Sequence, residues 1–282
     1  MFIYELKTMV YLSLIVLFTM IISCAAKGNH KSQKQNNFDP SKVVVVMSRG
    51  TSGSTELCGI VSHIVNSTVH GELFGGSMDV MREKSDPLKY MLDELSKQEQ
   101  RYPGQFVGFK YKPYFHNDAY EKVLNWFADN KVKIVYNVRN PLDVVIGGKK
   151  KAQEDGVNNC HTWQPDCVTK QQAVKIVLDI PDVLRKLEDL EIDYMLWYAR
   201  IKKAKLNVHL VTYEGVNYGT MQERLAYLQA LADFINPKYT VTEEVFEVKS
   251  VYVGHYHQNE TVTNYAELET ALKGTRYERC LH

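Results

Sequence analysis

Short apolar runs alternate with amphipathic stretches along the chain from about residue 43 to residue 234. Runs of strand length, rich in β-branched residues, predict strands at 43–48, 106–110, 133–138 and 207–212. Apolar positions at helical spacing predict helices at 55–66, 88–100, 118–130, 143–154, 170–205 (broken near Pro181) and 220–234. Apolar strands of this kind suit a parallel sheet that is covered on both faces. The pattern therefore predicts an α/β fold of three layers, P-loop-like, with a central parallel sheet flanked by helices.

The first 40 residues have a different pattern. Residues 9–26 form an uncharged apolar run, which as one helix would be roughly 27 Å long, near the short end of a bilayer span. A lysine precedes the run and small residues end it, as in a secretory signal peptide or an uncleaved anchor, with a buried core helix as the alternative. A polar stretch follows. We expect a signal peptide or signal anchor at 1–26, a polar stem at 27–40 and one folded domain at 41–282.

Either form of this segment would carry the domain into the secretory pathway. The protein would be secreted, or held in the Golgi as a single-pass type II protein that meets the membrane through its N-terminal helix. Glycosylation sequons at Asn66 and Asn259 agree with this route, unless burial blocks Asn66. The even number of cysteines after residue 26 agrees too. We expect a disulfide between Cys160 and Cys167, in preference to a zinc site that includes His161.

Composition narrows the possible functions. The 282 residues carry a formal net charge of +1, and 24% are charged and 45% hydrophobic. These values are typical of a globular protein and argue against disorder. A protein that neutralises many nucleic-acid phosphates needs a basic excess, so we expect no nucleic-acid partner.

Residues 48–57 (SRGTSGSTEL) join the first predicted strand to the first predicted helix. A glycine-rich turn at this place directs backbone N–H groups and the positive end of the helix dipole at one point, which predicts an anion site. The turn adds three hydroxyls and a guanidinium, those of Ser52, Ser54, Thr55 and Arg49. A tight turn with a serine cap is the alternative. No lysine follows Gly53, so the loop lacks the pattern of an ATPase or GTPase.

A second strand-to-helix junction lies at residues 136–148 (YNVRNPLDVVIGG). Arg139 stands at the junction, where its planar guanidinium could bind a second phosphate through two hydrogen bonds. Asp143 follows in the first helical turn, a favourable place for an acid. The alternative is a surface arginine beside an ordinary Asn-Pro turn.

These two segments resemble the sulfotransferase family, which transfers a sulfuryl group from 3'-phosphoadenosine 5'-phosphosulfate (PAPS) to a hydroxyl or amine. The family's R-S-G-[ST]-[ST] loop grips the 5' phosphosulfate, and SGST at 52–55 is similar to it. Its later R-[ND]-P-x-D-V-x-x-S segment grips the 3' phosphate, and RNPLDVV at 139–145 is similar to that. The stretches VHLVTYEGV at 208–216 and 264–281 also look like the family, the latter like its carbohydrate and nodulation-factor members.

The resemblance implies a donor site and two departures from the family pattern. Thr51 stands where a basic residue is expected, so Arg49 would have to grip the 5' phosphate. Gly147 replaces a serine that would bind the 3' phosphate. Lys149, Lys150 and Lys151 offer replacement charge, although a solvated basic face is the preferred interpretation. The implied donor-binding residues are Arg49, Thr51, Ser52, Gly53, Ser54, Thr55, Arg139 and Gly147.

The candidate catalytic residues are Glu72, His116 and Lys112. Glu72 is the first choice for the base that accepts the acceptor's proton, because its Gly-Glu pair looks like the carbohydrate-type members, and His116 is the second. Lys110 and Lys112 lie two residues apart on a predicted strand, so both face one side, where they could reach the leaving phosphate. We interpret His70 as an exposed or helix-end histidine, and Glu214 as a helix cap or a residue packed on the nucleotide pocket.

The predicted function is sulfuryl transfer from PAPS to a hydroxyl acceptor, with a carbohydrate as the expected acceptor. PAPS is the expected donor and the only cofactor, and the sequence offers no convincing cluster of metal ligands. Two alternatives stay open. One is a catalytically impaired sulfotransferase-like protein that binds a nucleotide or glycan, and the other is a kinase, which the missing loop lysine disfavours.

Overall fold

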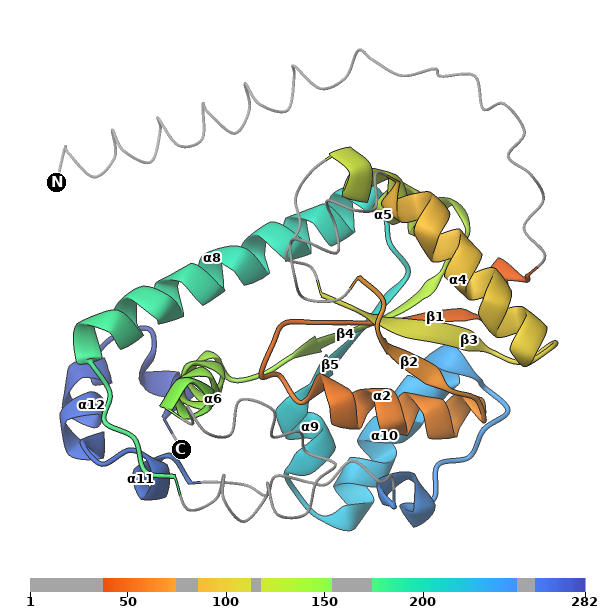
Figure 1. The fold of residues 1–282 in the computed structure, drawn as a ribbon. Helices are drawn as coiled ribbons and strands as arrows, with labels where there is room; N and C mark the ends of the chain where they lie inside the picture. Colours follow the sequence, from red (N-terminus) through yellow and green to blue (C-terminus); the bar gives the residue numbers. More distant parts are fainter. Residues whose placement is uncertain (1–37, 75–85, 113–117, 154–173, 248–256, 282) are drawn as a thin grey trace, which may run out of the picture. The chain divides into compact units, whose positions relative to one another are not determined.

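A parallel sheet of five strands, in the order β2-β3-β1-β4-β5, lies at the centre of the fold (Figure 1). The computed structural model describes residues 38–74, 86–112, 118–153, 174–247 and 257–281, within a unit that spans Asn37–His282. The strands are β1 (Val43–Ser48), β2 (Val69–Glu72), β3 (Val107–Tyr111), β4 (Lys133–Val138) and β5 (Val208–Thr212). The predicted α/β fold with a central parallel sheet is therefore confirmed.

Four of the five strands lie within one residue of their predicted positions. The exception is β2, a short edge strand with the sequence VHGE that contains a glycine and pairs with β3 through an irregular register. Glycine is depleted in strands, and four residues give too little pattern to distinguish a strand from a turn. No strand was therefore predicted at this position.

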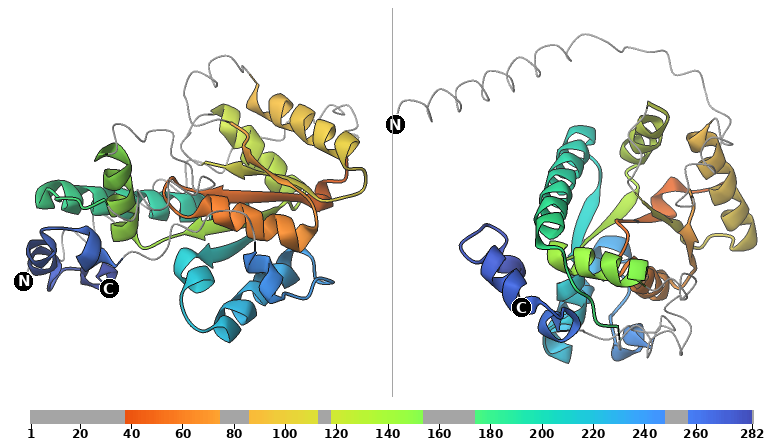
Figure 2. Two further views of the ribbon diagram at one scale, coloured as in Figure 1. Left: turned by 60° about the horizontal axis from the view of Figure 1, so that its bottom comes forward. Right: turned by 60° about the vertical axis from the view of Figure 1, so that its left-hand side comes forward.

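Helices cover both faces of the sheet (Figure 2). On one face, β1 side chains Val44 and Val46 pack with α2 and α10. On the other, Val45 and Met47 pack with α4, α5 and α8, because successive residues of a strand point to opposite faces. These helices are α2 (Ser54–Val65), α4 (Pro87–Arg101), α5 (Asp118–Asp129), α8 (Ile180–Ala204) and α10 (Met221–Ile235).

A third apolar cluster joins α6 (Pro141–Gln153) to α8 and to the C-terminal elements. It contains Leu142, Ile146 and Leu187, all fully buried, together with Leu268 and Leu272. This packing places the helix that follows Arg139 against the end of the chain. The remaining elements are α9 (Tyr213–Asn217), α11 (Gln258–Thr261), α12 (Tyr265–Leu272) and the 3-10 turns η1 (Pro40–Lys42), η2 (Glu243–Phe246) and η3 (Glu278–Cys280).

The start of α8 differs from the prediction of a helical region that begins at residue 170. The helix begins at Ile180, and Asp179 caps it by accepting a hydrogen bond from the Asp182 amide. Pro181 does not break a helix here, since proline fits in the first turn, where its missing N–H costs nothing. Residues 174–179 precede the helix in extended or irregular backbone.

Several N-terminal and cysteine predictions fall outside the described residues, namely the apolar run at 9–26, most of the stem and the Cys160–Cys167 disulfide. Phe38, near the end of the predicted stem, is buried beside Trp126. Cys58 and Cys280 are buried free thiols. In the part of the chain that is described, no helix combines the length and the apolar character that a membrane span requires.

Candidate functional site

The loop between β1 and α2 lies at the carboxyl end of the central strand, where parallel α/β sheets bind their ligands. Thr51 and Gly53 both adopt left-handed backbone, with φ of +60° and +76°. Gly53 is the N-cap of α2 and gives the helix no side-chain cap. The Ser52 hydroxyl donates back to the Arg49 carbonyl at 2.7 Å. The loop therefore does not use a serine cap, and the N-terminal turn of α2 faces the site through its backbone amides.

Gly53 is required by a close contact as well as by its backbone angle. A Cβ atom at this position would lie 2.3 Å from Cδ2 of Tyr213, the first residue of α9. Arg139 stacks on the same ring, with its guanidinium carbon 4.1 Å from the ring centroid. Tyr213 thus packs against both predicted phosphate-binding segments.

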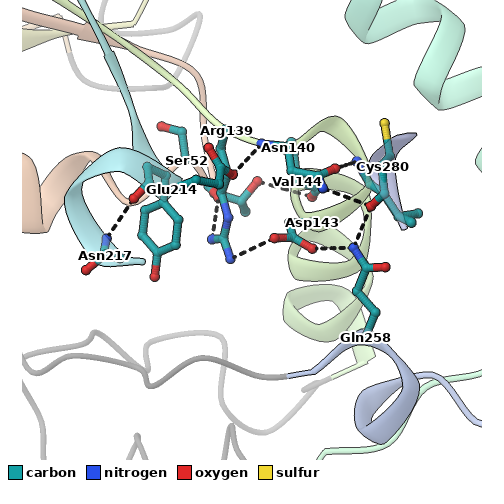
Figure 3. A network of polar contacts seen from close by, with 12 residues as sticks. Ser52, Arg139, Asn140, Asp143, Val144, Glu214, Asn217, Gln258 and Cys280 are labelled. Carbon is teal, nitrogen blue, oxygen red and sulfur yellow. Dashed lines mark hydrogen bonds and ion pairs between the residues drawn. The ribbon is translucent and has the colours of Figure 1, made fainter. Parts of the chain in front are cut away.

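The two segments also join directly through hydrogen bonds (Figure 3). The Arg139 guanidinium donates to the Thr51 carbonyl at 3.2 Å. The buried Asn137 amide, at the end of β4, donates to the Ser52 carbonyl at 2.7 Å. The Thr51 hydroxyl contacts the Val144 carbonyl of α6 at 3.2 Å. The loop after β1 and the junction after β4 therefore form one structure, with Arg139 beside the start of α2.

A buried polar network also holds Arg139 (Figure 3). Asp143, only 1% exposed, lies 3.7 Å from the guanidinium and accepts a hydrogen bond from Gln258 at 2.9 Å. Asn140 donates from its side chain to the Cys280 carbonyl at 2.8 Å. These bonds fasten the end of the chain to the arginine segment, so Arg139 does not lie at an ordinary surface turn. Asp143 is a partner of Arg139 and not only an acid in the first helical turn.

Glu214 fastens the same segment from the other side. Its carboxylate accepts from the Asn140 backbone N–H at 2.8 Å, and it lies in α9 next to Tyr213. The cap of the following helix is Thr220, which forms a capping box with Glu223. Of the two predicted roles for Glu214, the structure matches packing at the site and not the helix cap.

Glu56 is a site residue that the sequence analysis missed. It lies in the first turn of α2, accepts a hydrogen bond from Asn217 of α9 at 3.3 Å, and has Arg224 and Arg139 nearby. Burial raises the pKa of Glu56, and the Asn217 hydrogen bond and the two arginine charges only partly oppose this. An acid three residues after a glycine loop was the available signal, but an acid in a first helical turn is common for other reasons.

Glu72 bridges two lysines near the start of the loop that joins β1 to α2. Its carboxylate lies 3.0 Å from Nζ of Lys110 and 2.6 Å from Nζ of Lys112. The two lysines therefore face one side, as their spacing predicted. Burial disfavours the charged form of Glu72, but the hydrogen bonds and charges of Lys112 and Lys110 outweigh burial and lower its pKa. Because Tyr111 is paired with Met47, Lys112 lies level with Ser48, where the loop begins.

Arg49 is engaged by a carboxylate on α8. It forms an ion pair with Asp193, and both side chains are largely buried. The pair lies in the wall of a cavity of about 580 Å³ between the loop, α6 and α8. Both charged and small apolar side chains line this cavity, among them Lys149, Lys186, Asp189, Val145 and Leu190. The expectation that Arg49 grips the 5' phosphate stays a prediction.

The lysines after Gly147 do not form the solvated basic face that was preferred. Lys149 pairs with Asp182 of α8 at 3.1 Å, and Lys150 is only 6% exposed. Gly147 lies in α6 and is partly buried. The side chains of Lys151, His70 and His116 lie outside the described residues. Among the residues that are described, no three His, Cys, Asp or Glu side chains cluster closely enough to hold a metal ion.

The sequence matches no protein-family model and no curated protein. Among solved structures, the fold is similar to mouse sulfotransferase SULT7A1 complexed with PAP, with a TM-score of 0.42 and 13% identity over 87% of this chain and 90% of that chain. It is also similar to retinol dehydratase in complex with androsterone and inactive cofactor PAP, with a TM-score of 0.40 and 18% identity over 86% of this chain and 74% of that chain.

Proposed function

We propose that the protein is a sulfotransferase that moves a sulfuryl group from PAPS to a hydroxyl acceptor. The observation that carries this proposal is the junction of the two segments, in which Arg139 donates to the Thr51 carbonyl and shares the ring of Tyr213 with Gly53. A nucleotide with phosphates at both ends needs two anion sites at a fixed separation. In this proposal the loop amides and the N-terminus of α2 hold the 5' phosphosulfate, and Arg139 holds the 3' phosphate.

The proposed reaction is a direct displacement at sulfur. The acceptor oxygen forms a bond to sulfur while the bond from sulfur to the 5' phosphate oxygen breaks, and the acceptor's proton leaves to a base. Negative charge then grows on the departing phosphate, which the amides of the α2 N-terminus would stabilise. As in phosphoryl transfer, positioning and electrostatics supply most of the catalysis.

The lysine pair offers the positive charge that Thr51 does not. Lys112 lies level with Ser48, next to the start of the loop, and Glu72 holds Lys112 and Lys110 together. We assign these lysines to the leaving phosphate. Glu72 stays a candidate base, but both of its oxygens are bound to lysines and its pKa is lowered, which favours a positioning role. His116 stays the second candidate.

We propose a polar acceptor, with a carbohydrate as the first class to test. The cavity beside the loop supports this, since it offers carboxylates and cations that can bind sugar hydroxyls, from residues such as Asp189, Asp193 and Lys186. A purely apolar acceptor would displace water from these groups and offer them no hydrogen bonds in return. The resemblance of the C-terminal stretch to carbohydrate-type members agrees with the same choice.

Labelled donor tests the activity. The protein should transfer ³⁵S from PAPS to members of a glycan panel, and the bisphosphate product PAP should raise its melting temperature. A thermal shift by PAP without transfer to any acceptor would favour the impaired binding protein. Transfer of phosphate from ATP with magnesium, and no shift by PAP, would favour a kinase and refute the proposal.

Secretory targeting is a separate proposal. Residues 9–26 would direct the domain to the Golgi lumen or out of the cell, and the Asn66 and Asn259 side chains are exposed, as modification requires. Sequencing the mature N-terminus from eukaryotic cells would show whether cleavage occurs. A shift in mass on glycosidase treatment would support passage through the lumen, and a cytoplasmic, unmodified protein would contradict it.

A further inference from the structure

The central part of α8 carries an apolar strip on its outer side. Ile192, Met195 and Leu196 are 45%, 59% and 54% exposed, and Ala199 is also exposed. On a helix that turns 100° per residue these four positions lie within about 100° of one another, so they form one continuous strip. The opposite side of α8 packs into the core, where Trp197 and Leu187 are fully buried. In Figure 1, no described helix or strand lies alongside the central part of α8 on the side away from the sheet.

Charged residues of opposite sign flank this strip on the same side of the helix. Glu188 and Asp189 lie one turn before Ile192, and their side chains are 61% and 62% exposed. Lys202 and Lys203 lie about one turn after Ala199 and are exposed. Their intramolecular ion pairs are few and exposed: Asp189 contacts Arg185 at 3.2 Å, and Glu188 contacts Arg276 at 3.9 Å. Such pairs contribute little and are easily exchanged for others.

The strip and its flanking charges can pair with the same surface of a second, antiparallel copy of α8. If two copies of α8 cross with a twofold axis between Met195 and Leu196, Ile192 meets Ala199 of the second copy. Under the same symmetry Glu188 meets Lys203 of the second copy, and Asp189 meets Lys202 of the second copy. A twofold contact needs a surface that matches itself in this way, because each residue pair occurs twice.

We propose that α8 forms the centre of a twofold-symmetric dimer of this chain, with the strip buried between the two copies and the acidic and basic ends paired across it. The charges favour a second copy over an unrelated apolar partner, since a partner of other sequence has no reason to match both ends. The core of the strip is small, so the dimer would be of moderate affinity. The proposal does not depend on the proposed sulfotransferase activity.

The mass of the full chain in solution tests the proposal. Purified in one detergent throughout, the wild type should sediment as a dimer. Leu196→Glu, which places a charge against the apolar Met195 of the second copy, should raise the dissociation constant at least about tenfold. Met221→Glu on α10 is the matched control, because Met221 is 38% exposed and lies on the other face of the sheet. This control should stay dimeric, and all variants should keep the wild-type circular dichroism.

Charge exchange separates this dimer from any association through the N-terminal apolar run. Lys202→Glu with Lys203→Glu should give monomers, as should Glu188→Lys with Asp189→Lys, and a mixture of the two variants should give heterodimers. A monomeric wild type would overturn the proposal, even if it bound lipid vesicles through α8. So would a dimer that Leu196→Glu leaves intact, or a mixture of the charge variants that stays monomeric.

Discussion

Replacing Gly53 with alanine should disrupt the site more than the addition of one methyl group suggests. The residue has φ of +76°, where an L-residue costs about 1–2 kcal/mol. The new Cβ would also lie 2.3 Å from Cδ2 of Tyr213, so the ring must move, and forced overpacking of this kind costs about 1–3 kcal/mol. Together these effects predict a loss of about 2–5 kcal/mol in the free energy of unfolding. Moving Tyr213 also removes the surface on which Arg139 stacks, so PAP binding should weaken.

Gly104 provides a matched control for the backbone effect. It has φ of +72°, nearly the angle of Gly53, but a Cβ there would meet no atom within 4 Å. Gly104→Ala should therefore lose only the backbone cost of about 1–2 kcal/mol and should leave PAP binding unchanged. Urea unfolding and calorimetric titration with PAP measure the two quantities on both variants.

A double variant identifies the clash itself. Tyr213→Ala in the Gly53→Ala background removes the atoms that the new Cβ would strike, so part of the stability loss of Gly53→Ala should be absent in that background. Equal destabilisation by Gly53→Ala and Gly104→Ala, or additive effects of the two changes in the double variant, would refute the close packing of Tyr213 on the loop.

Three further predictions concern the site. Glu72→Gln should lower turnover while sparing donor affinity. It should also lower the free energy of unfolding at pH 7, because two lysines are left without a carboxylate. This loss should shrink below about pH 4, since a carboxyl with a lowered pKa stabilises the fold only at pH values above that pKa. Equal stability at pH 7 would contradict this. Glu56→Gln should stabilise the fold at pH 8 but not at pH 4, because an acid with a raised pKa destabilises the fold only when it is ionised. Urea unfolding at both pH values measures this difference. A loss of stability at pH 8 would contradict the prediction. Asn137→Ala should cost about 1–3 kcal/mol in unfolding free energy and weaken PAP binding, because the Ser52 carbonyl loses its buried donor; unchanged PAP affinity would show that this bond does not shape the loop.

The parts of the fold that sequence reasoning predicted are those with strong local patterns. Four consecutive valines allow little except a buried strand, and the capping residues of α10 mark its start. The edge strand β2 was missed because its four residues include a glycine, and its pairing depends on β3, which lies more than 30 residues further along the chain. No local pattern reports such a pairing.

The functional site shows the same difference between local motifs, which could be predicted, and long-range contacts, which could not. The glycine loop and the Arg139 junction were identified from short motifs, each at the end of a predicted strand. The groups that surround them come from distant segments: Asp193 pairs with Arg49, Gln258 with Asp143, and Glu214 with the Asn140 amide. These partners lie more than 70 residues away from the motif residues, so only the folded chain brings them together.

We expect the loop at 52–55 and Arg139 to bind opposite ends of one nucleotide. Titration of the wild type and Arg139→Ala with PAP and with adenosine 5'-phosphate, which lacks the 3' phosphate, tests it most directly. One charged hydrogen bond contributes about 1.5–3 kcal/mol, so Arg139→Ala should weaken PAP binding roughly 10- to 150-fold and change adenosine 5'-phosphate binding far less. If the wild type binds no PAP, or if Arg139→Ala weakens the binding of both ligands equally, Arg139 does not hold the 3' phosphate.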